Sequence, residues 1–298
     1  MVLAIAEVEP VPVLAGGDEV RRVAEKFIGG RENIILHDIR TNDAWARDHG
    51  PTFLNSRTQP PALVDWEYNA WGGKYPPYDL DNQVPRQIAE LTGRRRFATG
   101  VVLEGGAIDG DGQGTVLTTA SCVLNPNRNP DMSRERMEQL LADYLGAKKV
   151  LWAPRGELAG DDTDGHIDQL ARFVGPGTVV AAITEDESDE NFEPLQENLR
   201  AFREMRDATG RQLEVIPLPL PAPKYYDGQR LPACYCNFYI ANGLVLVPQF
   251  GDPADDHALG ILRELMPQHE VRGLPSLDLV WGLGSFHCLT QQEPRQEF

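Results

Sequence analysis

The sequence predicts an α/β fold in which one local unit recurs around a ring. Turn signals between short apolar strands alternate with stretches of helical periodicity, and a polar loop precedes each strand pair. No low-complexity linker divides the 298 residues, and a chain of this length can bury a substantial core. We therefore expect a single domain over residues 1–298.

Each unit is expected to begin with an antiparallel hairpin. The strongest signal is Asn242-Gly243, because this dipeptide suits a two-residue turn with positive φ and lies between two apolar runs. Glycine-rich turns and one looser connection mark the others. The four hairpins are expected at 52–64, around 109–112, around 175–177 and at 238–247.

Helices are expected between the strands, because apolar residues recur there at intervals of three and four. Ser133 is a candidate N-cap of the third helix, Gly146 is expected to end it, and Gly210 is expected to end the fourth. We expect every apolar stripe to face the core. The five helices are predicted at 18–27, 81–91, 134–145, 195–205 and 258–265.

Five helices accompany only four complete hairpins. A fifth hairpin would need a C-terminal strand around 286–290 together with a strand before Val11, and the residues ahead of Val11 are few and irregular. We therefore expect a closed ring of repeats that lacks one N-terminal strand.

Polar residues occur in phase with the expected units. They lie at intervals of 56, 62, 71 and 51 residues along the chain. A ring of repeats would bring all of them to one end of a central axis, where distant residues share one pocket. These residues are Asp48, Glu104, His166, Asn237 and Cys288.

Composition restricts the classes of partner. The net charge is −17, which disfavours nucleic acid and anionic membranes as partners and is compatible with a small cation. No apolar run approaches a membrane span, and no secretory signal is recognisable. Four unevenly spaced cysteines suit reduced thiols, so a cytoplasmic location is expected.

Three segments could be interpreted as metal sites, but each has a simpler interpretation. Cys234-Tyr-Cys236 lacks a second ligand pair, and the calcium-like run 109–114 would place Ala120 where a glutamate is needed. The acids 161, 162 and 164 could join His166, although hydrogen bonding within their loop is the simpler role for Asp162. We expect no metal and no cofactor.

A cysteine, a histidine and carboxylates are the groups needed for thiolate attack on an electron-poor carbon held as a cation. Asp168 follows His166 by two residues, so in an alternating strand both side chains would point the same way. Either cationic His166 or a bound guanidinium would lower the pKa of the Cys288 thiol. His287 is expected to point away from Cys288 and to be structural.

The motifs at these loops resemble the agmatine deiminase family, relatives of bacterial peptidylarginine deiminases with the pentein fold. The likeness runs from about Val11 to Pro294. It is carried by Asn42–Pro51, Trp71–Tyr75, Glu104–Ile108, Asp111–Thr115, Asn125–Pro130, Gly160–His166, Asn237–Gly243, Phe250–Pro253 and Gly282–Gln292.

The resemblance implies a five-bladed αβ propeller of ββαβ modules and cofactor-free hydrolysis of agmatine to N-carbamoylputrescine and ammonia, a step toward putrescine. It implies that Cys288 is the nucleophile and His166 the general acid/base. Asp48 and Asp168 would clamp the guanidinium group, with Glu104 beside His166. Family members usually carry a further N-terminal stretch, and we expect it to be absent here.

Two residues are further candidates for substrate binding: Trp45, as a pocket wall, and Asp162. The expected partner is a small cationic guanidine, and the expected assembly is a homodimer. The alternatives are deimination of another guanidine such as peptidyl-arginine, amidino transfer to an amine, and a ring that binds cations without turnover.

Overall fold

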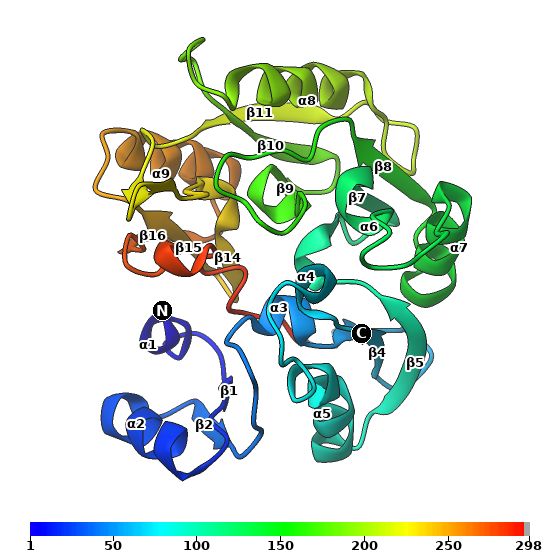
Figure 1. Cartoon of the computed structure of the whole chain (residues 1–298), viewed down its shortest axis with the longest axis vertical. Coiled ribbons are helices and arrows are strands. Elements are labelled where there is room, and N and C mark those ends of the chain that lie inside the picture. The colour runs from blue at the N-terminus through cyan, green and yellow to red at the C-terminus, as the bar shows by residue number, and fades with distance from the viewer. Residues whose placement is uncertain (295–298) are drawn as a thin grey trace.

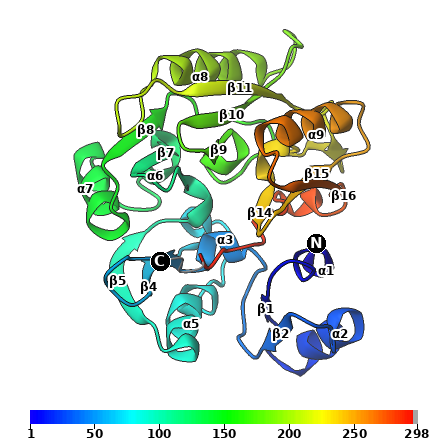
Figure 2. The same ribbon diagram turned by 180° about the vertical axis from the view of Figure 1, so that it is seen from behind.

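The computed structural model describes residues 1–294 and contains a recurring unit of two antiparallel strands, a helix and a third, parallel strand. Figure 1 shows the sheets around a common centre, with the long helices outside them, and Figure 2 shows the same arrangement from behind. The α/β class is confirmed. No helix within 1–294 is both long and apolar enough to cross a membrane.

Four units are complete. In each, the middle strand pairs antiparallel with the strand before it and parallel with the strand after the helix. Their strands are β3 (Thr52–Leu54), β4 (Ala62–Glu67), β5 (Arg95–Val102), β6 (Ile108–Gly110), β7 (Thr115–Thr119), β8 (Lys149–Ala153), β9 (Ala171–Gly175), β10 (Thr178–Ile183), β11 (Glu214–Pro219), β14 (Tyr239–Ala241), β15 (Leu244–Gln249) and β16 (Glu270–Pro275).

The first unit has a two-stranded parallel sheet. Its strands β1 (Val11–Leu14) and β2 (Ile34–His37) flank helix α2 (Asp18–Ile28). Residues ahead of β1 form a short helix, α1 (Val2–Ile5), which packs on the β14–β15 hairpin through Ala4 and Ile5. The conjectured partner strand at 286–290 is wrong, because that segment folds into hydrogen-bonded turns.

The long helices follow the predicted stripes with two corrections. Ser133 Oγ accepts from the Arg136 N–H at 3.1 Å, and Gly146 ends its helix in the left-handed conformation, as predicted. The fourth helix ends at Glu204, with Met205 as its C-cap, rather than near Gly210. The other four units use α5 (Val84–Thr92), α7 (Arg134–Leu145), α8 (Phe192–Glu204) and α9 (Ala254–Leu265), and short helices are α3 (Ala46–His49), α4 (Ala70–Gly73) and α6 (Ala120–Val123).

The second correction concerns the apolar stripe of α2, which is exposed rather than buried. Val20, Val23 and Phe27 were expected to face the core, but they are 54%, 47% and 65% exposed. Leu91 on α5 is also exposed. The stripe of α2 has no apolar layer over it, because its own sheet contains only β1 and β2 among the described residues.

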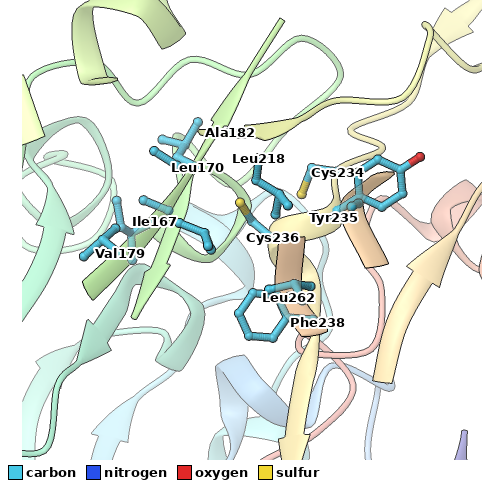
Figure 3. Close-up of a cluster of buried hydrophobic side chains, with 14 of the residues drawn as sticks. Ile167, Leu170, Val179, Ala182, Leu218, Cys234, Tyr235, Cys236, Phe238 and Leu262 are labelled. Atoms are coloured by element: carbon cyan, nitrogen blue, oxygen red, sulfur yellow. The ribbon is translucent and has the colours of Figure 1, made fainter. Parts of the chain in front are cut away.

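The largest buried cluster extends through the third, fourth and last units and contains the Cys234-Tyr-Cys236 segment (Figure 3). Cys234 and Cys236 are free thiols among apolar side chains such as Leu218 and Leu170, so they serve as small core residues. The short 3₁₀ turns are η1 (Asp81–Gln83), η2 (Gly105–Ala107), η3 (Ile167–Gln169), η4 (Tyr235–Asn237) and η5 (Val280–Gly282). They occur between the units (η2, η3 and η4), directly before α5 (η1) and after β16 (η5). A small hairpin, β12 (Tyr225–Tyr226) with β13 (Gln229–Arg230), follows the fourth unit, and its Tyr226 ring stacks on Trp281.

Candidate active site

The polar loops converge as their spacing predicted. Each of the four complete units is preceded by a helical turn, and these turns, α3, η2, η3 and η4, pack against one another in pairs. The C-terminal segment reaches the same place, because the Arg47 N–H donates to the carbonyl of Cys288 at 3.0 Å. Residues up to 241 positions apart (288 − 47) therefore share one centre.

Gly106 lies at this centre. A Cβ atom added to it would lie 2.6 Å from His166 Nδ1, 2.8 Å from Asp48 Oδ1 and 3.1 Å from Asp168 Oδ2. Three reactive atoms thus surround one point, and only a residue without a side chain leaves room for them. Gly106 also donates its backbone N–H to Asp48 Oδ1 at 3.0 Å.

The sulfur of Cys288 is held by Asn237 beside Asp168. The side-chain amide of Asn237 donates to Cys288 Sγ at 3.1 Å, and Sγ is 3.6 Å from Asp168 Oδ2. The amide oxygen of Asn237 accepts from the backbone N–H of Cys288 at 3.3 Å and of His287 at 3.1 Å. One buried asparagine therefore orients both the thiol and its backbone.

His287 belongs to the site, and the prediction that it points away is wrong. Its Nδ1 lies 2.6 Å from Asp168 Oδ2, and its side chain is buried. The prediction assumed an extended chain, whereas 286–289 is turned. The strand assumed for His166 and Asp168 is also wrong, because η3 begins directly after His166.

Asp48 is anchored by groups other than its neighbour Arg47. The indole N–H of Trp71 donates to Asp48 Oδ2 at 3.0 Å, while Arg47 Nε donates to the His287 carbonyl at 3.3 Å. Trp71 itself lies in a left-handed turn with φ 54°. A bulky residue seldom adopts that conformation, so this backbone is held in place by its surroundings.

Glu104 lies close to His166 but bonds to another group. Arg128 Nε donates to Glu104 Oε1 at 2.7 Å, and both side chains are buried. Glu104 Oε2 and both ring nitrogens of His166 have no hydrogen-bond partner within the described part of the chain. His166 Nδ1 is 3.7 Å from Asp48 Oδ1.

Burial favours the uncharged forms of the titratable side chains in the site. It raises the pKa of Asp168 to about 7 and raises the pKa of Asp48 well above its ordinary value, with Asp168 adding to the effect on Asp48. It also raises the pKa of the Cys288 thiol and lowers that of His166 well below its usual range. A cation placed between the two acids would favour their charged forms.

A pocket of about 260 Å³ reaches Cys288 and Asp48 from the surface. Its wall includes the predicted substrate-binding residues Trp45 and Asp162, together with Trp71. None of the residues that line it is a lysine or an arginine. The others are Asp43, Tyr75, Thr163, Trp281, Gly282, Leu283 and Gly284.

The acidic side chains of the 160–165 loop have hydrogen-bond partners that differ from those predicted. Asp161 accepts from the backbone N–H groups of Thr163 and Gly165 at 3.1 and 3.0 Å, so Asp161 holds the loop together. Asp162 instead accepts from the Tyr75 hydroxyl across the pocket. Asp164 pairs with Arg128 and with Lys74, at 2.9 Å for Lys74. These contacts leave no shared metal site for the three acids.

Some functional neighbours were not found from the sequence. Arg128, Tyr75 and His287 lie in motifs that carry the family likeness, but their contacts join distant loops, so their roles were not predicted. Asn237 was noticed because it is in phase with the other loops. Among the described residues, one group has the spacing of metal ligands: Glu104, Cys122 and His166.

The profile of the Porphyromonas-type peptidyl-arginine deiminase family matches residues 1–294. The agmatine deiminase of Pseudomonas aeruginosa is 41% identical over 314 residues, covering 98% of this chain and 84% of that protein. The structure of an Enterococcus faecalis agmatine deiminase has a TM-score of 0.89 at 36% identity, covering 98% and 85% of the two chains. A substrate-bound agmatine deiminase of C. jejuni has a TM-score of 0.89 at 32% identity, covering 97% and 83%.

Proposed function

The chain belongs to the Porphyromonas-type peptidyl-arginine deiminase family, and we propose that it hydrolyses the guanidinium group of agmatine to N-carbamoylputrescine and ammonia. The observation that carries this proposal is the convergence of Cys288, His166, Asp48 and Asp168 at one end of an acidic pocket. A thiol, an imidazole and two carboxylates are sufficient for this hydrolysis without a cofactor.

The negative charge of the pocket favours agmatine over other guanidines as the substrate. Agmatine carries a cation at each end, and the pocket presents Asp48 near Cys288 together with Asp43 and Asp162. Its aromatic wall of Trp45 and Trp71 suits a methylene chain and a cation. Free arginine would bring a carboxylate to a wall without lysine or arginine, which is unfavourable.

The two acids are proposed to clamp the guanidinium fork. Asp48 and Asp168 lie on either side of Gly106, so their carboxylates can accept N–H donors from one planar cation. Burial raises the pKa of Asp168 to about 7, so in the free site the protonated and ionised forms coexist near neutral pH, and the protonated form must lose its proton to clamp the cation. Binding of the cation supplies the charge that favours the loss.

In the proposed reaction, the Cys288 thiol proton passes to His166 and the sulfur bonds to the guanidinium carbon. His166 then donates that proton to the departing nitrogen, so the carbon–nitrogen bond breaks and ammonia leaves. A water next gives one proton to His166, and its oxygen bonds to the thiouronium carbon. The carbon–sulfur bond then breaks while the second proton of that oxygen passes to solvent, where the released ammonia takes it up, which leaves a neutral carbamoyl product. The proton on His166 returns to the thiolate.

Either a cationic His166 or the bound guanidinium could lower the pKa of the Cys288 thiol, and the guanidinium is the better supported of the two. Burial lowers the pKa of His166, and Arg128 lowers it further, so a cationic imidazole is disfavoured in the free site. The Cys288 thiol has a raised pKa from burial and from the nearby Asp168 and Asp48. A substrate cation between these acids would oppose their effect on the sulfur.

Glu104 is proposed to stabilise His166 while it holds the proton. Arg128 takes one oxygen of this carboxylate and leaves the other without a partner among residues 1–294. The arrangement follows the logic of an acid that orients a catalytic histidine. Asp162, at the pocket mouth, is the proposed acceptor for the distal amine of agmatine.

At the level of the fold, the proposal is a pentein five-bladed αβ propeller whose first unit lacks one strand. Its support is the recurrence of the same strand order in four sheets and the two-stranded first sheet. The central end of the units carries the site, as the family likeness implies.

The test is a comparison of ureido product formed from agmatine, arginine and an arginine-containing peptide. We expect kcat/KM to be highest for agmatine, and no product from the Cys288→Ser variant, which should still bind agmatine in a calorimetric titration. Cys234→Ser is the matched control, because Cys234 is equally buried but lies in the apolar core. Wild-type binding without product, or full activity of Cys288→Ser, would overturn the proposal.

A further inference from the structure

Cys122 lies behind the catalytic centre and has no part in the proposed reaction. It belongs to α6, directly after β7, and its side chain is fully buried. Its sulfur, a carboxylate oxygen of Glu104 and a ring nitrogen of His166 all lie within 4.8 Å of one another. Three different chemical types of metal ligand therefore face one point.

The other two members of this group have unused binding capacity. Glu104 Oε2 and both ring nitrogens of His166 are buried without a hydrogen-bond partner among residues 1–294. Burying a polar atom without a partner is costly, so such atoms gain most from a ligand. Arg128 occupies only the other oxygen of Glu104, at 2.7 Å.

We propose that Glu104, Cys122 and His166 form an inhibitory binding site for a Zn²⁺ ion. Zinc accepts sulfur, nitrogen and oxygen ligands at about 2.0–2.3 Å in a tetrahedron, so its ligand atoms lie roughly 3–4 Å apart. The three groups need to close only slightly from their present separation to reach that geometry. The fourth position remains available for a water molecule.

Zinc binding removes the groups that the proposed reaction needs. The ion displaces the proton of the Cys122 thiol, which passes to solvent, and takes a lone pair of His166. A His166 that is bound to zinc can no longer carry a proton between Cys288 and the leaving nitrogen. The pocket gives an ion access as far as Asp48, whose carboxylate is 3.7 Å from the His166 ring, and the ion would have to pass this contact to reach the three ligands.

The activity arm of the test rests on the proposed function. We expect Zn²⁺ to lower kcat of the wild type and a chelator to restore it. Cys122→Ser should keep most of its activity and need at least about tenfold more Zn²⁺ for half inhibition, because loss of a direct ligand weakens metal binding at least as much as loss of its supporting contacts. Cys234→Ser, another buried cysteine outside the group, should keep the wild-type sensitivity.

The second arm is independent of activity and separates Cys122 from Cys288. Co²⁺ added to Cys288→Ser should give a near-ultraviolet thiolate-to-cobalt absorption band, and Cys288→Ser with Cys122→Ser should give none. A band that requires Cys288 instead, or unchanged zinc sensitivity of Cys122→Ser, would overturn the proposal. Since Cys122 packs in an apolar cluster, Cys122→Ala serves as a second variant if the serine form does not fold.

Discussion

The Nδ1 atom of His287 lies 2.6 Å from Oδ2 of Asp168, and the same oxygen is 3.6 Å from the sulfur of Cys288. Burial lowers the pKa of His287 well below its usual range, and Arg172 and Arg47 lower it further. The ring is therefore neutral, and when Asp168 is ionised the Nδ1–H tautomer donates to it without adding a charge. In this arrangement His287 positions the carboxylate that is proposed to clamp the substrate.

We expect His287→Phe to lower kcat/KM for agmatine about 10- to 100-fold, since a hydrogen bond to a charged group contributes about 1.5–3 kcal/mol. His287→Asn can place its amide nitrogen near the position of Nδ1, so it should recover much of the loss. His257→Asn, on the exposed side of α9, is the control. Equal kinetics for His287→Phe and the wild type would show that this contact does not position Asp168.

Trp71→Phe removes the indole N–H that donates to Asp48 Oδ2 at 3.0 Å. This hydrogen bond lowers the pKa of Asp48, so its loss should raise that pKa further. We expect kcat/KM to fall about tenfold and its acid limb to move to higher pH. Steady-state kinetics across pH would measure both effects.

Trp66→Phe is the matched control for Trp71→Phe. Trp66 is also buried and donates its indole N–H to Thr52 Oγ1 at 3.1 Å, away from the pocket. Both tryptophans lose one hydrogen bond, but only Trp71 contacts a clamp acid. Similar losses in the two variants would indicate a general effect of stability rather than positioning.

Gly106→Ala should disable the site while the rest of the fold remains intact. The added methyl group would lie 2.6 Å from His166 Nδ1 and 2.8 Å from Asp48 Oδ1, so both groups must move. A displacement of about 1 Å at reacting groups can cost about 100-fold in rate, and we expect at least that loss in kcat. Gly175→Ala, where nothing lies within 4 Å, should be active; wild-type kcat in Gly106→Ala would refute the crowding argument.

Asp168 should make the ligand-free protein less stable as pH rises. Its pKa in the folded protein is about 7 against an ordinary 3.8, so the folded state holds a proton that the unfolded state has released between these values. The associated stability is complete below the ordinary pKa and is lost as pH rises through about 7. Asp168→Asn imitates the protonated form and should escape the loss.

Thermal and urea unfolding at pH 4 and pH 8 would measure this effect. The variant should exceed the wild type at pH 8 by at most about 4 kcal/mol in the free energy of unfolding, and much less at pH 4. It should also be inactive, since an amide cannot clamp a cation as a carboxylate does. Asp79→Asn, an exposed position, is the control; a stability gap independent of pH would contradict the assignment to Asp168.

Local signals predicted the hairpins and helices because turns and caps depend on neighbouring residues. Asn242-Gly243 forms the tight turn that its dipeptide indicates, with Gly243 at φ 70°, and Ser133 caps its helix. The exposed stripe of α2 could not be predicted this way. Periodicity shows that Val20, Val23 and Phe27 share one face, but which layer covers a face is decided by other elements.

The site was predictable to the extent that repetition placed its residues in phase. Asp48, Glu104, His166 and Cys288 were expected together, and the structure brings them to one centre. Their roles, and assembly as a homodimer, stay predictions. The hydrogen bonds of the site could not be predicted, because His287 and Trp71 reach the acids through turns whose local geometry has no sequence signal.

The sequence by itself determined the order of strands and helices and the chemical types available to the site, since these follow from periodicity, turn residues and side-chain identity. Only the tertiary structure decided which atoms meet. Gly106 can admit three reactive groups around one point only when loops from separate units close upon it. Such contacts, and the burial that shifts the pKa values of Asp168 and His166, depend on long-range packing that no local pattern contains.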